Sequence, residues 1–512
     1  MNPINRPSFA PEADDPGPRR ALILAGGGMR VSYQAGVLRA LAEAGLHFVH
    51  GDATSGGTMN LAMLFSGLSP VEMCDRWRTL EVKNFISLMP IKDYLKAFDM
   101  MAMGDADGIV DSVFPHLGID VAKINRAEGM LGTFNVCNYT DKTNEAIPHD
   151  KVDLDFLIAG ISLPIFMPPV QKGDVIYTDS VWIKDANLME AVRRGADELW
   201  VVWCIGNMNT YNTGFFNQYV HMIELSANGA LHEEFVQINE INARIEKGET
   251  VYGHTTPIKL HLIKPEYPLP LDPDLYLGHI DNASLIDMGY ADAKTYLNRR
   301  TQAGTPFQPV STKMRTPKTG ITFRETMRGY FSMDEIDPKS GAKKGKDTDT
   351  TLSMHVTIHI EDLYDFLGNP YHAGRITGRV DYPPFGSNIP AKRGVFNLFH
   401  PSDDPALLLM IYELAFEVEG QAYYLAGRKE VRDDPGFDLW QDTTTLFTRL
   451  HRGEDSTAQI VGAGVLTLSV SALKKVLSTI HVTHAASTKE KTKALYDFGQ
   501  FFMGSLWDTY LK

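Results

Sequence analysis

The sequence predicts an α/β domain with a mostly parallel sheet, followed by a second domain that is mostly β. Three observations predict this fold class. A short apolar strand pattern leads through a turn into an amphipathic helix, and the same order recurs directly after it. Further apolar runs and helical patterns continue to about residue 302. Beyond residue 320 the sequence becomes β-leaning, with short runs separated by glycine-rich breaks.

Bulk composition narrows the class of protein. The 512 residues are too many for one compact core, so we expect at least two domains. The net charge of −14 argues against nucleic acid as the main ligand, because phosphate repels an acidic surface. Three widely spaced cysteines, Cys74, Cys137 and Cys204, argue against a disulfide framework and a cysteine-based zinc site. No run reaches the roughly 20 apolar residues that span a bilayer, and we expect a cytoplasmic protein.

Composition also divides the chain. Residues 1–18 are rich in proline and charge and have no apolar stretch, which predicts a disordered leader rather than a signal peptide. We assign residues 19–302 to the α/β domain. Residues 303–320, rich in proline, threonine, glycine and lysine, are expected to be a linker. Residues 321–512 then form the second domain, with a terminal helix around 487–511.

The α/β domain begins with the run Ala21–Ala25, which is wholly apolar, as expected of a buried parallel strand. Val31, Leu38 and Leu41 then recur at helical spacing, and Gly45 is placed to end this helix. A weaker strand, a turn and a second helix of small and apolar residues follow.

The rest of the domain continues this pattern. The run "LWVVWCIG" is typical of another buried strand, and a long helix is predicted from roughly Phe215 to Ile245. Residues 85–103 are rich in methionine and phenylalanine. Such a composition favours core packing, and a flexible cap over an apolar site is the alternative.

Gly26, Gly27 and Gly28 lie between the first strand and the first helix, and Arg30 follows. Backbone N–H groups of such a loop can point into open space beside the positive end of a helix dipole. The loop could therefore hold a phosphate or stabilise an oxyanion. No P-loop motif is present, and Val31 stands where a dinucleotide fingerprint has its third glycine. A dinucleotide site and a tight turn without a ligand remain as alternatives.

Ser55 follows the second predicted strand at a sharp turn. A G-x-S-x-G nucleophile elbow exposes the serine Oγ between small residues. Here Ala53 replaces the first glycine of that pattern, whereas Gly57 keeps the second. The alternative is a serine that only caps the following helix, which is a common use of serine.

A serine nucleophile needs a group that takes its proton. Asp179 stands at the end of the alternating run "DVIYTD", from which it could reach Ser55, although aspartate is also common in turns. The histidines of this domain near the motifs, His47, His50 and His149, are expected to be surface or structural residues.

In this order, the three pieces resemble the patatin-like phospholipase family over roughly residues 18–300. The stretch "GGGMRVSYQAGVLRALAEAGL" is similar to the family's oxyanion loop and first helix, and "TSGGTMN" stands at its nucleophile serine. The stretches "ISLPIFMPPV" and "YTDSVWIKDANLMEAVRRGADELWVV" are similar to its proline-rich segment and its catalytic aspartate segment. The resemblance implies a three-layer α/β/α domain around a central, mostly parallel sheet.

The resemblance also implies a serine acyl hydrolase of lipid esters, like a phospholipase A or a lysophospholipase, that works through an acyl-enzyme. Ser55 would be the nucleophile and Asp179 its base. Gly26, Gly27 and Gly28 would form the oxyanion hole, with Arg30 supporting the loop. No metal or organic cofactor is implied, and the partners would be a lipid substrate and, peripherally, a membrane surface. A catalytically inactive lipid-binding protein and an acyltransferase are the alternatives.

Three positions depart from the family pattern. Val31, Ala53 and Ser180 stand where the family usually has glycine. If any of these positions needed a positive φ, we would expect a backbone strain of about 1–3 kcal/mol.

The second domain resembles an accessory module found in bacterial proteins beside sterol-oxidase-like flavoenzymes, which implies at most an association with lipid. The polar run 337–350 is expected to be an exposed loop. One strand face carries four polar residues that favour a solvated surface over a metal site: His355, Thr357, His359 and Glu361.

Overall fold

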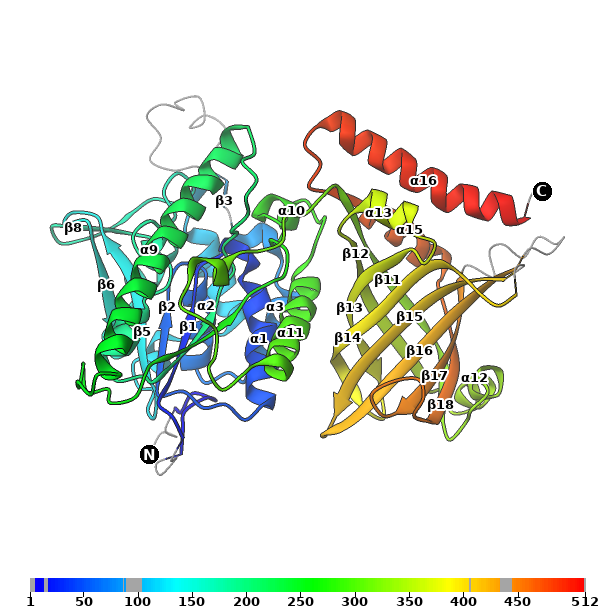
Figure 1. Cartoon of the computed structure of the whole chain (residues 1–512), viewed down its shortest axis with the longest axis horizontal. Coiled ribbons are helices and arrows are strands. Elements are labelled where there is room, and N and C mark those ends of the chain that lie inside the picture. The colour runs from blue at the N-terminus through cyan, green and yellow to red at the C-terminus, as the bar shows by residue number, and fades with distance from the viewer. Residues whose placement is uncertain are drawn as a thin grey trace. The chain divides into compact units, whose positions relative to one another are not determined.

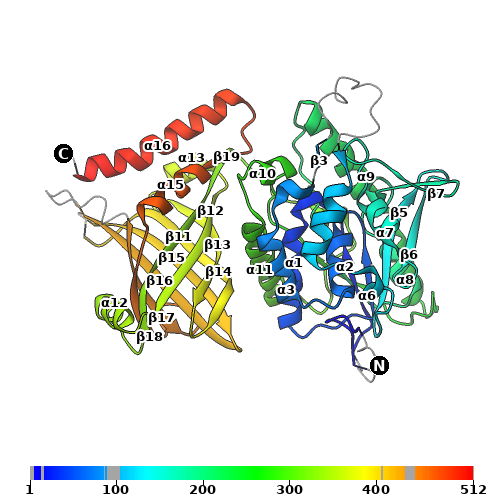
Figure 2. The same ribbon diagram turned by 180° about the vertical axis from the view of Figure 1, so that it is seen from behind.

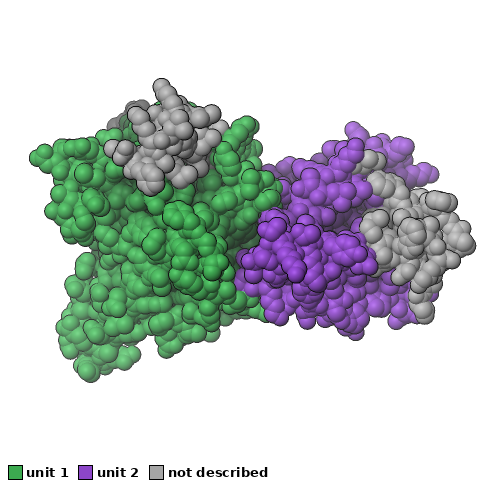
Figure 3. Space-filling view, turned by 90° about the horizontal axis from the view of Figure 1, so that it is seen from above, with its two compact units in different colours: residues 1–316 green, residues 317–512 purple. Residues whose placement is uncertain are grey.

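The computed structural model describes residues 5–12, 17–85, 87–88, 104–404, 407–432 and 444–510. The chain divides into two compact units, Met1–Thr316 and Pro317–Lys512 (Figure 3). The division falls inside the stretch 303–320 that was expected to be a linker. The first part of that stretch belongs to the first unit, because Phe307 is buried in its core. Among the described helices, none combines the length and apolar character needed to cross a membrane.

The first unit is built on an eight-stranded mixed sheet with the strand order β10-β9-β1-β2-β5-β8-β7, and β6 pairs with β5. Strands β10, β9, β1, β2 and β5 run parallel, whereas β6, β7 and β8 form antiparallel pairs at one side. The strands are β1 (Arg20–Leu24), β2 (His50–Ala53), β5 (Leu131–Asn138), β6 (Thr143–Pro148), β7 (Val170–Lys172), β8 (Val175–Thr178), β9 (Glu198–Val202) and β10 (Lys259–Ile263). A separate two-stranded sheet pairs β3 (Ser87–Leu88) with β4 (Gly104–Asp105).

Helices cover both faces of this sheet, which confirms the three-layer fold. Side chains of β1 alternate: Leu22 and Leu24 join one apolar core, and Ala21 and Ile23 join another. Figure 1 shows α9 across one face, and Figure 2, from behind, shows α1, α2 and α3 across the other. The main helices are α1 (Ser32–Glu43), α2 (Gly57–Phe65), α3 (Pro70–Thr79), α7 (Leu154–Ile161), α8 (Leu188–Arg193), α9 (Phe215–Ile245) and α11 (Asn282–Arg299). Shorter turns are η1 (Gly28–Val31), η2 (Val82–Phe85), η3 (Ile109–Val113), α5 (Phe114–Leu117), α6 (Val121–Ile124), η4 (Ser180–Trp182), α10 (Asp272–Tyr276) and η5 (Pro309–Thr312).

The described part of the expected leader is ordered against the first unit. The ring of Phe9 is only 1% exposed and makes an edge-to-face contact with Phe48 at 5.3 Å between centroids. The Asn5 side chain donates hydrogen bonds to the carbonyls of Phe65 and Lys123. Residues 5–12 therefore pack against the first unit through one aromatic ring and one amide, despite the proline and charge content of this segment.

The second unit is an antiparallel sheet that closes on itself, which confirms the predicted β-rich domain. Closure follows from β11, which pairs both with β18 and with β12 at the other end of the strand order. The strands are β11 (Gly320–Met333), β12 (Thr351–Ile360), β13 (Ala373–Tyr382), β14 (Gly386–Pro401), β15 (Leu407–Val418), β16 (Gln421–Arg432), β17 (Thr445–Arg452), β18 (Gln459–Thr467) and β19 (His481–Thr483). Its helices are α12 (Pro338–Asp347), α13 (Leu363–Gly368), α15 (Val470–Thr479) and α16 (Thr488–Tyr510).

The interior of this unit contains a buried ion pair. The Lys429 ammonium donates to Glu325 Oε1 at 2.7 Å, and the Tyr412 hydroxyl donates to Glu325 Oε2 at 2.9 Å. Lys429 and Glu325 side chains are only 3% and 4% exposed. Because both carboxylate oxygens are hydrogen-bonded, the buried negative charge is compensated.

The polar run 337–350 is mostly a helix rather than the expected exposed loop. Asp337 caps the N-terminus of α12 by accepting a hydrogen bond from the Ser340 amide. Gly341 and Gly345 let the helix approach neighbouring backbone, since a Cβ at Gly341 would lie 2.1 Å from the Ala463 carbonyl oxygen. Tertiary packing of glycines thus produced a helix where composition predicted a loop.

The polar residues considered on this strand face, His355 and His359 of β12 and Glu361 just after it, have separate partners. His355 Nε2 lies 2.9 Å from Asp381 Oδ2, and His359 Nε2 lies 3.3 Å from Thr377 Oγ1. The Glu361 carboxylate accepts a hydrogen bond from Arg375 at 2.8 Å.

Candidate active site

Ser55 occupies a sharp elbow between β2, which ends at Ala53, and α2, which begins at Gly57. Its own φ is +53°, in the left-handed region that non-glycine residues rarely adopt. The next two residues must be glycine, because a Cβ at Gly56 would lie 2.5 Å from the Gly28 carbonyl oxygen, and one at Gly57 2.2 Å from that of Leu24. The elbow therefore packs directly on β1 and the glycine-rich loop.

The three departures from the glycine pattern create no left-handed strain. Val31 has a helical φ of −68°. Ala53 and Ser180 also have no positive φ. The strain considered for these positions is thus absent, and the strained residue of the site is Ser55 itself.

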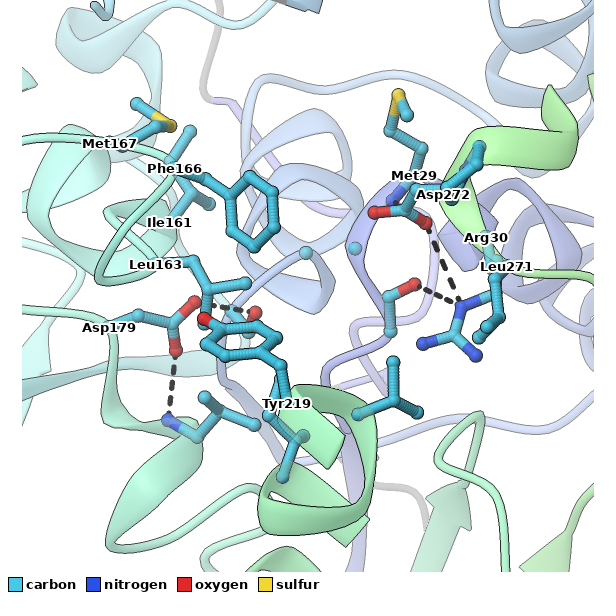
Figure 4. Close-up of a pocket in the computed structure, with 18 of the residues that line it drawn as sticks. Met29, Arg30, Ile161, Leu163, Phe166, Met167, Asp179, Tyr219, Leu271 and Asp272 are labelled. Atoms are coloured by element: carbon cyan, nitrogen blue, oxygen red, sulfur yellow. Dashed lines mark hydrogen bonds and ion pairs between the residues drawn. The ribbon is translucent and has the colours of Figure 1, made fainter. Parts of the chain in front are cut away.

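Ser55 and Asp179 form a buried hydrogen-bonded pair. The Ser55 hydroxyl donates to Asp179 Oδ2 at 2.7 Å, and the Val181 amide donates to Asp179 Oδ1 at 2.8 Å. The two residues follow the ends of β2 and β8, and their side chains are 6% (Ser55) and 1% (Asp179) exposed. Figure 4 shows Asp179 with its hydrogen bond. The Val181 amide thus fixes Oδ1 of the carboxyl group, and Oδ2 faces the Ser55 hydroxyl.

Burial raises the pKa of Asp179 to about 7, although the hydrogen bonds from Ser55 and Val181 act in the opposite direction. A carboxylate with a pKa near neutrality is a stronger base than an exposed aspartate, yet it is still ionised in a large fraction of molecules at pH 7. This pair can therefore transfer a proton from the serine to the aspartate.

The two buried histidines near the motifs have partners other than this pair. His50 Nε2 bonds to Thr133 Oγ1 at 2.8 Å, and burial lowers the pKa of His50 to about 3. His149 Nδ1 accepts a hydrogen bond from the Gly132 amide at 3.1 Å. Both side chains thus join neighbouring segments of the sheet.

The glycine-rich loop lies beside Ser55 and presents two backbone amides. The Gly26 amide is occupied, because it donates to Asp185 Oδ1 at 3.0 Å. Among the described residues, the Gly27 and Gly28 amides have no hydrogen-bond partner, and both residues line the cavity at Ser55. Of the three glycines expected to form the oxyanion hole, Gly26 therefore has no amide available for a ligand, because that amide already donates to Asp185. Only Gly27 and Gly28 remain as candidate donors of this loop.

Arg30 and Asp272 brace the loop from outside. Arg30 Nε donates to the Gly27 carbonyl at 2.9 Å and lies 3.8 Å from Asp272 Oδ1, and Asp272 in turn accepts from the Met29 amide at 3.2 Å (Figure 4). Gly28 has φ of +58°, and a Cβ there would lie 2.3 Å from Asp272 Oδ2, so only glycine fits. The guanidinium and the carboxylate together restrict the path of the loop.

One further donor was missed by sequence reasoning. The Gly56 amide, directly after the serine, also has no partner among the described residues. In nucleophile elbows this amide contributes to the oxyanion hole, so the G-x-S-x-G pattern itself was the available signal.

A polar network beneath the site was also missed. Asn135 on β5 donates to the Ala53 carbonyl at 3.0 Å and accepts from Asn144 and Asn187 at 2.9 and 2.8 Å. Asn144 accepts in turn from the Ser180 hydroxyl. The network connects the strand before Ser55 with the segment after Asp179, and no sequence motif predicts it.

An apolar cavity of about 440 Å³ opens at the Ser55–Asp179 pair. Its walls are mostly aliphatic, methionine and aromatic side chains, including Met29, Ile161, Phe166, Met167 and Tyr219 (Figure 4). Met59 also lines the cavity. Cavities of this size and polarity bind apolar small molecules or chains. Most of the stretch 85–103, considered above as a cap over the site, lies outside the described residues.

Comparison with known proteins adds a family likeness. Residues 22–192 match the family model described as patatin-like phospholipase. Among solved structures, VipD from Legionella pneumophila is 12% identical, with 55% of this chain and 67% of that chain covered and a TM-score of 0.31. No curated protein matches the chain. The family match includes Ser55, Asp179 and the glycine-rich loop.

Proposed function

We propose that this chain, whose residues 22–192 match the patatin-like phospholipase family model, is a serine acyl hydrolase of lipid esters with Ser55 as nucleophile and Asp179 as base. The family supports a lipid ester hydrolase in general. The observation that carries the finer assignment is the 2.7 Å hydrogen bond from Ser55 Oγ to Asp179. It lies in an apolar cavity beside the Gly27 and Gly28 amides, which have no partner among the described residues.

In the first step, Ser55 Oγ attacks the ester carbonyl carbon while its proton passes to Asp179 Oδ2. The carbonyl oxygen becomes an oxyanion, which the amides of Gly27 and Gly28 stabilise, with Gly56 as a further donor. Donors fixed before the reaction stabilise this charge without reorganising, and each is typically worth about 10²–10³ in rate. The tetrahedral intermediate then breaks the bond to the alcohol, which takes the proton from Asp179 and leaves.

In the second step, water attacks the acyl-enzyme carbonyl and gives its proton to Asp179. Ser55 leaves with that proton, and the carboxylic acid is released. The apolar cavity would hold the acyl chain throughout. If another alcohol replaced water at this step, the same site would act as an acyltransferase. The route requires no metal or organic cofactor.

The substrate would come from a lipid surface, with which the protein would make peripheral contact. Phe215 and Leu225 on α9 are 82% and 72% exposed, while Tyr219 of the same helix lines the cavity. Apolar side chains so close to the cavity would favour contact with lipid.

A fluorophosphonate probe tests the nucleophile directly. Wild type should be labelled, and Ser55→Ala should not. Ser69→Ala is the matched control: it removes a serine that caps α3 and does not line the cavity, and it should be labelled like wild type. Equal labelling of wild type and Ser55→Ala would refute the assignment. A panel of lipid esters that vary in head group and acyl length, assayed with the same variants, then separates a hydrolase from an inactive lipid-binding protein.

A further inference from the structure

We propose that Asp185 is a positioning residue that holds the glycine-rich loop so that the Gly27 and Gly28 amides face the reacting carbonyl. The inference rests on the function proposed above for Ser55 and Asp179. It concerns a carboxyl group that has no part in the proton transfers of that mechanism.

The contact between Asp185 and the loop is direct and fully buried. Asp185 is 1% exposed, and its Oδ1 accepts the Gly26 amide hydrogen bond at 3.0 Å. A Cβ at Gly26 would lie 2.3 Å from this oxygen and 2.8 Å from Ser55 Cβ. The carboxyl and the nucleophile thus pack on the same glycine, and the Gly26 amide is turned away from the reaction by a dedicated acceptor.

One short segment carries both Asp179 and Asp185, so the base and the loop are positioned together. The segment is held at its far end by the Leu188 amide, which donates to Glu234 Oε2 at 2.7 Å, and by Asn187, which donates to Asn135 Oδ1 at 2.8 Å. A displacement of this segment would therefore move the base and the oxyanion donors in concert.

The other carboxyl oxygen of Asp185 is unusual. Asp185 Oδ2 is buried and has no hydrogen-bond partner among the described residues. An ionised carboxylate in this place would carry charge on an unsolvated, unpaired oxygen, whereas a neutral carboxylic acid would not. The geometry thus favours the acid form, whose carbonyl oxygen can still accept the Gly26 hydrogen bond.

Electrostatics agrees with the geometry. Burial, with a smaller contribution from Asp179, raises the pKa of Asp185 to about 8, while the Gly26 amide and the positive charge of Arg30 lower it. The Cys204 thiol also interacts with Asp185, but burial raises its own pKa to about 12, so it stays neutral. Lys184, the preceding residue, is paired with Glu234 at 2.6 Å. An ionised Asp185 would place a negative charge behind the loop and oppose formation of the oxyanion. Activity should accordingly fall as Asp185 ionises in alkaline solution.

Two substitutions separate positioning from a merely structural role. Asp185→Ala removes the acceptor and should lower kcat by about 10²-fold, the typical effect of losing one oxyanion donor, with little change in KM. Asp185→Asn keeps an acceptor for the Gly26 amide and should rescue most of that loss. Because asparagine cannot ionise, this variant should also lack the decline in kcat/KM above about pH 8 that we expect of wild type.

Asp287→Asn is the control for neutralising a buried carboxyl elsewhere in the unit: Asp287 is 1% exposed and lies 3.6 Å from Arg78. It should keep the wild-type pH profile.

Each variant is compared by melting temperature, fluorophosphonate labelling rate and pH profile of ester hydrolysis. If wild type is labelled but Asp185→Ala is labelled and turns over as fast, the inference fails while the proposed function stands. An unchanged alkaline limb in Asp185→Asn also overturns it, even if the alanine variant does not fold. Absence of labelling in wild type would instead refute the proposed function, and the inference with it.

Discussion

Replacing Asp179 with asparagine should abolish hydrolysis and at the same time stabilise the fold at neutral and alkaline pH. The new side chain would keep an oxygen for the Val181 amide, and its NH₂ group would face the Ser55 hydroxyl oxygen, so no buried group loses its partner. It cannot accept a proton from Ser55. Loss of a general base typically costs about 10²–10⁴ in rate.

The stabilisation follows from the raised pKa. The pKa of Asp179 is about 7 in the folded state and 3.8 in an unfolded chain. Between these values the native state binds more protons than the unfolded state, so the free energy of unfolding falls as the pH rises. At 1.36 kcal/mol per pKa unit, burial of this carboxyl costs about 4 kcal/mol above pH 7 and less than half of that at pH 5. Relative to wild type, Asp179→Asn should thus gain about 2–3 kcal/mol in free energy of unfolding between pH 5 and pH 8.

Urea unfolding followed by tryptophan fluorescence measures this difference. Four of the six tryptophans, Trp77, Trp182, Trp200 and Trp203, lie in the first unit and report mainly on it. Hydrolysis of a short-chain nitrophenyl ester, assayed in parallel, should fall in wild type as the pH drops below about 7. If the stability difference between the two proteins were the same at pH 5 and pH 8, the carboxyl would not be buried as the structure has it.

Three further outcomes are expected. Gly28→Ala should lower kcat by about 10²-fold, because the added methyl group collides with Asp272 and shifts the loop amides. Stopped-flow measurement of acylation tests this, and a wild-type rate would contradict it. Met59→Trp should shorten the preferred acyl chain, because the larger side chain fills part of the cavity. The assay compares kcat/KM for esters of increasing acyl length. If kcat/KM fell equally for all lengths, the acyl chain would not bind in this cavity. In the second unit, Glu325→Ala should destabilise the closed sheet by about 3–5 kcal/mol, because it leaves the buried Lys429 charge unpaired. Amide hydrogen exchange should show faster exchange in the second unit and unchanged exchange in the first. Loss of protection in both units would indicate that they unfold together.

Much of the candidate site could be predicted from local sequence. Ser55, Gly57 and the glycines after β1 were identified because a sharp turn between a strand and a helix requires small residues in consecutive positions. Asp179 was identified because it follows a strand with the alternating pattern. The strain considered at the replaced glycines is absent, since whether a position has a positive φ depends on the exact path of the turn.

Partners far apart in the chain could not be predicted in the same way. Gly26 and Asp185 are separated by 159 positions, and no spacing rule connects them. Asn135 likewise joins the segments that carry Ser55 and Asp179 from the middle of a strand that looks ordinary in sequence. Phe9, inside a proline-rich leader, is buried because its ring packs on Phe48 and its carbonyl accepts a hydrogen bond from the Phe48 amide.

By itself, the sequence determined the fold class of both domains, the order of strands and helices around the elbow, and the residue types of the candidate site. These depend on periodicity and on steric limits that act over a few residues. Only the tertiary structure decided which loop amides lack a partner among the described residues, which carboxyl accepts the serine hydrogen bond and which accepts the Gly26 amide, and that β11 closes the second sheet. Those outcomes depend on burial and on hydrogen bonds between distant segments, which exist only once the chain has folded.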